Sequence, residues 1–132
     1  MGAEAWDYFV PYEEDIDQAL QKLRVREFRA GRYNGAERHA ASIDEVLENM
    51  DADGTRSILD MTHVAEEPEF FAVARFTKEQ LLRVFGTERP TREMIEGNHD
   101  LYEELDRGQG AYVIVYKDGK PSEIFFAGYS FD

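Results

Sequence analysis

Three histidines are the side chains of this 132-residue chain best suited to acid–base or metal chemistry. His39, His63 and His99 lie far apart in the sequence, and no His-x-x-x-His spacing would place two imidazoles on one helix face. A metal site would therefore need convergence in space with Asp60 or Asp100. Isolated structural histidines are the favoured interpretation, and the metal site is the alternative.

The serines lack the surroundings of a hydrolase nucleophile. None lies in a Gly-x-Ser-x-Gly turn, which exposes a catalytic hydroxyl at the end of a strand. The chain has no cysteine, which excludes a thiolate nucleophile, a disulfide and a cysteine metal site. Carboxylate pairs are too abundant among the 28 acidic residues for one pair to indicate glycoside hydrolysis. The sequence thus predicts no catalytic residue, no cofactor and no metal, and it favours a protein without enzymatic activity.

One acidic segment matches part of the pattern of an EF-hand calcium loop. Oxygen ligands occupy its first, third and fifth places, glycine the sixth and a carboxylate the twelfth, which are Asn49, Asp51, Asp53, Gly54 and Asp60. However, Arg56 stands where an apolar residue is usual, and Asp60 is shorter than the bidentate glutamate. The residues that follow alternate like a strand and not like an exit helix. An acidic turn is the favoured interpretation, with calcium binding as the alternative.

The charge balance restricts the class of partner. Asp and Glu outnumber Lys and Arg by 28 to 15, giving a formal net charge of −13. Such a chain repels phosphate backbones and anionic lipid, so we expect neither nucleic acid nor a membrane as a partner, and we expect a basic protein. The start of the chain has no signal-peptide pattern, and no apolar run approaches the roughly 20 residues of a membrane span. With the absence of cysteine, this predicts a cytoplasmic location.

A basic island interrupts the acidic chain between Lys22 and Arg38, with six basic residues against Glu27 and Glu37. Helix-end compensation and salt bridges are the favoured interpretation. The alternative is a small enzyme or small-molecule binder, in which the Arg24–Arg38 island lines a pocket together with Tyr33 and a histidine.

The clearest structural signal is Asp118-Gly119, which separates two runs rich in aromatic and β-branched residues. This pair favours a type I′ turn, so residues 111–129 are predicted to form a β-hairpin. An uninterrupted register places Tyr116 opposite Pro121 and Tyr112 opposite Phe125. One predicted face carries Val113, Val115, Ile124 and Phe126. The other carries Tyr112, Ile114, Tyr116 and Phe125, and it is either covered by a helix, as we favour, or exposed to a partner.

The remaining elements follow from periodicity and capping. We predict a strand at 6–12, helices at 12–30, 42–50 and 77–85, and a helical stretch from 90 that breaks at Gly97-Asn98. Strands at 57–64 and 70–76 are predicted to form a second hairpin. Adjacent strand pairs indicate an antiparallel or mixed sheet with helices packed on one face, in a single α+β domain spanning 1–132.

Two sets of residues are candidates for partner binding. The acidic set comprises Asp51, Asp53, Glu66, Glu67 and Glu69, joined by Glu103, Glu104 and Asp106. The aromatic set is centred on Tyr112 and Tyr116 of the predicted hairpin. A solvated face and a buried core are the respective alternatives.

The opening Tyr-Phe-Val-Pro-Tyr and the ending Phe-Ala-Gly-Tyr-Ser-Phe-Asp resemble stretches of small acidic bacterial proteins with no assigned activity. In size, acidity and lack of cysteine the chain is also similar to immunity proteins, which neutralise a toxin by binding it. That resemblance implies a cytosolic inhibitor whose acidic side chains meet a basic groove. A nucleic-acid mimic, with carboxylates spaced like phosphates, is a further alternative.

Overall fold

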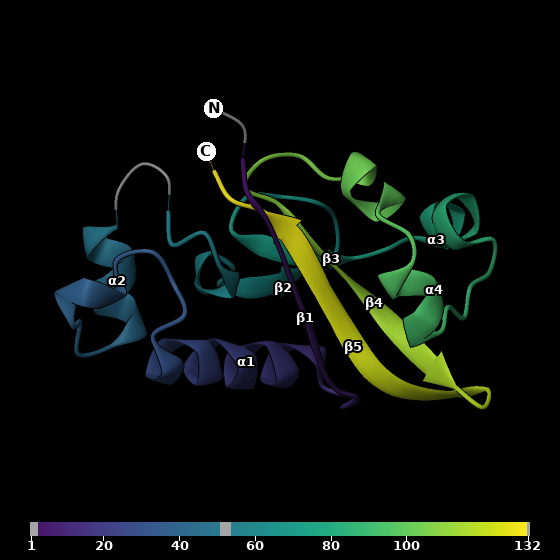
Figure 1. Ribbon diagram of the computed structural model, residues 1–132, viewed down its shortest axis with the longest axis horizontal. Coiled ribbons are helices and arrows are strands. Elements are labelled where there is room, and N and C mark those ends of the chain that lie inside the picture. Colours follow the sequence, from purple (N-terminus) through teal and green to yellow (C-terminus); the bar gives the residue numbers. More distant parts are fainter. Residues whose placement is uncertain (1–2, 51–53, 132) are drawn as a thin grey trace.

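The computed structural model describes residues 3–50 and 54–131, and within them five strands form one mixed sheet in the order β1-β5-β4-β3-β2 (Figure 1). The strands are β1 Ala5–Pro11, β2 His63–Ala65, β3 Ala72–Arg75, β4 Gly110–Lys117 and β5 Lys120–Tyr129. β5 is antiparallel to both β1 and β4, whereas β2, β3 and β4 are parallel. The predicted α+β fold with a C-terminal hairpin is confirmed.

The helices begin and end where the sequence supplies caps. The α-helices are α1 Ile16–Ala30, α2 Ile43–Asn49, α3 Lys78–Phe85 and α4 Arg92–Glu96, and the 3₁₀ helices are η1 Ala36–Arg38, η2 Ile58–Asp60 and η3 Asp100–Glu104. Thr77 and Gln80 form the predicted capping box of α3, and Gly31 in the left-handed conformation ends α1. No helix in the described ranges is long and apolar enough to cross a membrane.

Helices cover both faces of the sheet, with α1 on one side and α3 and α4 on the other (Figure 1). The first core, under α1 and η2, includes Trp6, Leu20, Ile58, Tyr112 and Phe126. The second core, under α3, α4 and η3, includes Val84, Ile95, Leu101, Val113 and Phe125. This corrects the expectation of helices on one face, because β4 and β5 carry large apolar side chains on both faces and both must be buried.

A bulge at Ser122 changes the register of the β4–β5 hairpin. Asp118 and Gly119 have φ angles of 53° and 77°, which confirms the type I′ turn, and Tyr116 pairs with Pro121 as predicted. The next pair is Val115 with Glu123, so Ser122 has no partner on β4. Every later pair is offset by one residue, as in Tyr112 with Phe126, Val113 with Phe125 and Ile114 with Ile124. Because strand side chains alternate, Ile124 and Phe126 share a face with Tyr112 and not, as predicted, with Val113.

The prediction of a second hairpin from the strands at 57–64 and 70–76 is wrong. β2 and β3 pair in parallel, with His63 opposite Ala72. The loop between them therefore returns from the end of β2 to the start of β3, so residues 66–71 run back along the edge of the sheet. β2 is the edge strand, so this loop forms part of the molecular margin.

We expect deletion of Ser122 to destabilise the protein by about 2 kcal/mol, because it keeps the pairs from Val115–Glu123 onward but removes the local twist of the bulge and the carbonyl that accepts the Tyr12 N–H. Ser122→Ala keeps the bulge, including the carbonyl that accepts the Tyr12 N–H at 3.1 Å, and should cost less than about 1 kcal/mol. Urea unfolding of both variants measures the difference. Equal stabilities would show that the bulge does not contribute to the stability of the hairpin.

Candidate functional site

The three histidines are exposed and do not gather into one site. No group of three His, Asp or Glu side chains that could hold a metal ion occurs within residues 3–50 and 54–131. His63 Nε2 lies 2.6 Å from Glu69 Oε1, and His63 Nδ1 lies 2.9 Å from Thr62 Oγ1. Thr62 Oγ1 also donates to the Phe71 carbonyl at 3.2 Å. Both His63 and Glu69 are about half exposed, so these contacts fasten the loop to β2 and form no enclosed nucleophile.

The basic island is largely occupied by structural contacts. Glu27 is 2% exposed and accepts hydrogen bonds from Arg32 Nε at 2.9 Å, Arg32 Nη2 at 2.8 Å and Arg26 Nε at 2.9 Å. The hydrogen bonds from Arg32, opposed by burial and aided by Arg26, lower the pKa of the Glu27 carboxyl. Arg24 is 8% exposed and donates to the Leu59 carbonyl at 3.2 Å. Arg26 and Arg32 thus form salt bridges at the end of α1, as the favoured interpretation predicted, and Arg24 attaches α1 to η2. Arg29 lines a hollow of about 580 Å³ with Tyr33 and His39, which is the arrangement of the alternative interpretation.

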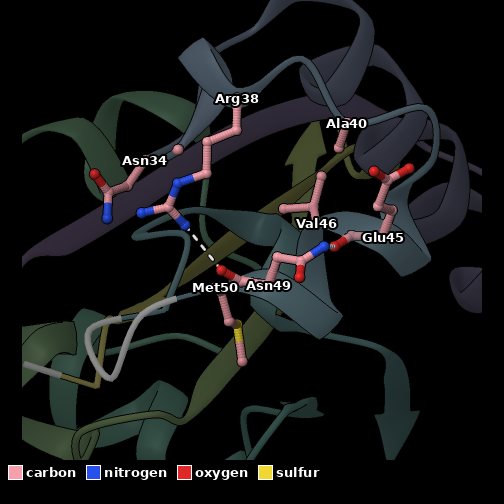
Figure 2. Close-up of a pocket in the computed structure, with 8 residues that line it drawn as sticks. Asn34, Arg38, Ala40, Glu45, Val46, Asn49 and Met50 are labelled. Atoms are coloured by element: carbon pink, nitrogen blue, oxygen red, sulfur yellow. Dashed lines mark hydrogen bonds between the residues drawn. The ribbon is translucent and has the colours of Figure 1, made fainter.

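Arg38, the last residue of the island, lines a hollow of about 360 Å³ between η1 and α2 (Figure 2). Its Nη1 donates to the Asn49 carbonyl at 2.8 Å and so satisfies a backbone oxygen at the end of α2. The guanidinium therefore braces the two short helices against each other across this hollow.

The acidic segment resembling a calcium loop has a buried end. Asp60 is 0% exposed, and its Oδ1 accepts from the Thr55 N–H and from the Thr55 hydroxyl, each at 2.7 Å. Burial raises the pKa of the Asp60 carboxyl, against the lowering effect of the hydrogen bonds from Thr55. Asp51 and Asp53 lie outside the described residues. Asp60 thus serves as an internal acceptor that shapes the turn before η2.

The two residues of the predicted aromatic set differ in exposure. Tyr112 is 7% exposed in the first core, and Tyr116 is half-buried with the Arg89 guanidinium 5.7 Å from its ring centroid. The structure therefore has helices over both faces of the hairpin, which is the alternative that we favoured.

The predicted acidic set is divided among different parts of the fold. Glu103 and Glu104 belong to η3, where the Arg83 Nε donates to Glu104 Oε2 at 3.2 Å. Asp106 is exposed in the turn that precedes β4, and its carbonyl accepts from the Gln109 N–H at 3.2 Å. Glu66, Glu67 and Glu69 are exposed together in the β2–β3 loop. The described residues of the acidic set therefore fall into two groups, these three in the β2–β3 loop and the other three in and after η3.

An aromatic cluster lies in the same loop, and we did not predict it. Phe70 and Phe71 are 58% and 42% exposed, and Phe131 packs on both, with ring centroids 6.3 Å and 4.9 Å away. We define the loop surface as Glu66, Glu67, Glu69, Phe70, Phe71 and Phe131. The sequence carried one signal for it: two adjacent phenylalanines in a strand cannot both face the same core.

The loop surface is held in a strained conformation. Phe71 has a φ of 66°, which is unusual for a bulky residue. Its N–H donates to the Gly108 carbonyl at 3.2 Å, and its carbonyl accepts the Thr62 N–H at 2.7 Å. A Cβ at Gly108 would lie 2.4 Å from Phe131 Cε1, so glycine is required where Phe131 crosses the backbone. Strain of this kind persists where surrounding contacts enforce it, and it is frequent at binding sites.

Neither family models, curated proteins nor solved structures gave a match to this chain.

We expect Gly108→Ala to destabilise the protein by about 3 kcal/mol, since the new methyl group adds a clash with Phe131 to the cost of a positive φ. Gly86 is a matched control, because its φ of 74° equals the 72° of Gly108 within two degrees and its Cβ would meet no atom within 4 Å. Gly86→Ala should cost only about 1 kcal/mol. Thermal or urea unfolding measures both, and equal losses would contradict the packing of Phe131 over Gly108.

We expect Glu27→Gln to cost about 2 kcal/mol at pH 7, because it removes a buried charge that accepts from two arginines. A lowered pKa means that the ionised form stabilises the fold above the unfolded pKa of about 4.3, and that this contribution is lost as the pH falls through the lower folded value. The difference between native protein and variant should therefore shrink below about pH 4. Exposed Glu37→Gln is the control and should leave stability nearly unchanged; a Glu27 effect independent of pH would refute the ion-pair explanation.

Proposed function

We propose that this protein is a non-enzymatic binding protein of the immunity type, which inhibits a basic protein partner in the cytoplasm by binding it through the loop surface. The observation that carries the proposal is the exposure of Phe70 and Phe71 in the same loop as three exposed glutamates, next to the edge strand β2. Buried aromatic anchors within a polar rim are the usual source of binding energy at protein interfaces.

The charge supports a basic protein as the occupant. The chain carries a formal net charge of −13, so its field attracts cationic surfaces and speeds their encounter. Nucleic acid and anionic membranes would be repelled by the same field. Glu66, Glu67 and Glu69 are close in sequence to the phenylalanines, so a cationic groove with an apolar floor would match the loop surface.

The loop is also prepared for binding before any partner arrives. The hydrogen bonds of Phe71 to Gly108 and Thr62, with the His63–Glu69 pair, fix the backbone between residues 62 and 71. A fixed loop loses little conformational freedom on association, so more of the contact energy contributes to affinity. The fixed backbone and the adjacency of Phe70 and Phe71 distinguish the loop surface from single exposed apolar residues such as Leu82 and Met94.

We expect Phe71→Ala to weaken binding of the partner at least about 30-fold, which corresponds to the roughly 2 kcal/mol of an anchor residue. Leu82→Ala is the matched control, because Leu82 is 45% exposed against 42% for Phe71 and should change the affinity less than about threefold. The partner is first captured from cells of the source organism with the intact protein, then purified and measured by surface plasmon resonance.

The contribution of the three glutamates of the loop surface is tested in the same assay. Exchanging Glu66, Glu67 and Glu69 for glutamine should slow association about tenfold and flatten its dependence on salt. An acidic partner, or a partner whose binding ignores Phe71 and these glutamates, would overturn the proposal.

A further inference from the structure

A second hollow, of about 530 Å³, lies at the carboxyl end of β3 and has a cationic lining. Arg75 is the last residue of β3, Lys78 is the first residue of α3, and Arg89 lies in the connection from α3 to α4. Three cations around one hollow are unexpected in a chain with nearly twice as many acidic as basic residues.

Two of these cations are not used in ion pairs. Among residues 3–50 and 54–131, neither Arg75 nor Arg89 pairs with a carboxylate, whereas the exposed Arg32 and Arg92 each do so at 2.8 Å. Lys78 is 4.0 Å from Glu88, at the outer limit of an ion pair. The Arg89 guanidinium instead lies over the Tyr116 ring. The donors of both arginines are therefore left for another acceptor.

The walls of the hollow are fixed by contacts within the fold. Phe76 is buried in the second core, and Leu81 and Tyr116 are half-buried, so together they supply apolar surface. The Tyr116 N–H donates to the Pro90 carbonyl at 2.9 Å and attaches the α3–α4 connection to β4. A backbone bridge between Thr91 and Tyr116 reinforces this attachment. Arg89 therefore lies next to Pro90, whose carbonyl is hydrogen-bonded to β4.

We propose that this hollow binds the phosphate group of a small phosphorylated molecule. A phosphate dianion offers several acceptor oxygens, which suit two forked guanidinium groups and an ammonium group better than the two oxygens of a carboxylate do. Carboxylates elsewhere on the protein are screened beyond roughly 8–10 Å at physiological salt, so the adjacent cations dominate the local field.

Two features of the hollow restrict the ligand. Glu66 and Glu88 also line it, so the phosphate must lie toward Arg75 and Arg89 and away from these carboxylates. The volume exceeds that of a phosphate ion and falls within the range of small-molecule sites, which leaves space for an organic portion against Tyr116 and Leu81. This inference concerns a different part of the surface from Phe70 and Phe71 and does not depend on the proposed inhibitor function.

Titration of the full chain with inorganic phosphate at constant ionic strength tests the site, with NMR detection of the arginine Nε–Hε signals. We expect saturable shifts of Arg75 and Arg89, with a dissociation constant on the order of millimolar for this minimal probe. Arg75→Gln and Arg89→Gln should each weaken binding about tenfold. Arg29→Gln is the control, since Arg29 is an exposed arginine at the end of α1 that does not line this hollow.

Unfolding temperatures close to that of the native protein establish that the variants are folded. If Arg75→Gln is unstable, the Arg75 signal of the Arg89→Gln variant still reports phosphate binding. Shifts that do not saturate, that sodium chloride reproduces, or that Arg29→Gln abolishes would overturn the proposal. Phe71→Ala should bind phosphate normally, so this result is separable from the test of partner binding.

Discussion

Burial of both faces of the β4–β5 hairpin is the constraint on which the rest of the structure depends. Tyr112 and Phe126 face the first core, and Val113 and Phe125 face the second, so neither side of the hairpin can be left to solvent. α1 and η2 cover one face of the hairpin, and α3, α4 and η3 cover the other. The bulge at Ser122 decides which β5 side chains enter which core.

This double cover determines where recognition can occur. The faces of the central strands are covered, and two adjacent large apolar side chains are exposed in the loop that follows the edge strand β2. There Phe70 and Phe71 are exposed, supported by Phe131 and by the glycine backbone at Gly108. Phe71 precedes the first residue of β3, and Arg75 at the other end of this strand lines the cationic hollow.

Local signals in the sequence predicted much of this fold. The Asp118-Gly119 turn and the Thr77 capping box depend only on neighbouring residues, and both are present as predicted. The bulge at Ser122 was missed because the energy that favours it comes from packing against distant helices. The parallel pairing of β2 and β3 was missed because parallel strands normally need a crossover of a dozen or more residues, and this connection has six.

The candidate site was predictable only in part, for the same physical reason. Glu66, Glu67 and Glu69 were identified from charge, which a sequence displays directly. Tyr112 was assigned to a possible surface because the predicted register was one residue out, and it is buried. The contact of Phe131 with Phe71 joins segments 60 residues apart, and the positive φ of Phe71 gives no signal in a residue type that rarely adopts it.

The central claim is that the exposed phenylalanines of the β2–β3 loop are the place where a basic protein binds. Its most direct measurement is photo-crosslinking in cells of the source organism, with a benzophenone amino acid at position 71 and, as control, at position 82. We expect one basic protein to be crosslinked from position 71 and not from position 82. An identical pattern from both positions, or an acidic protein at position 71, would contradict the claim.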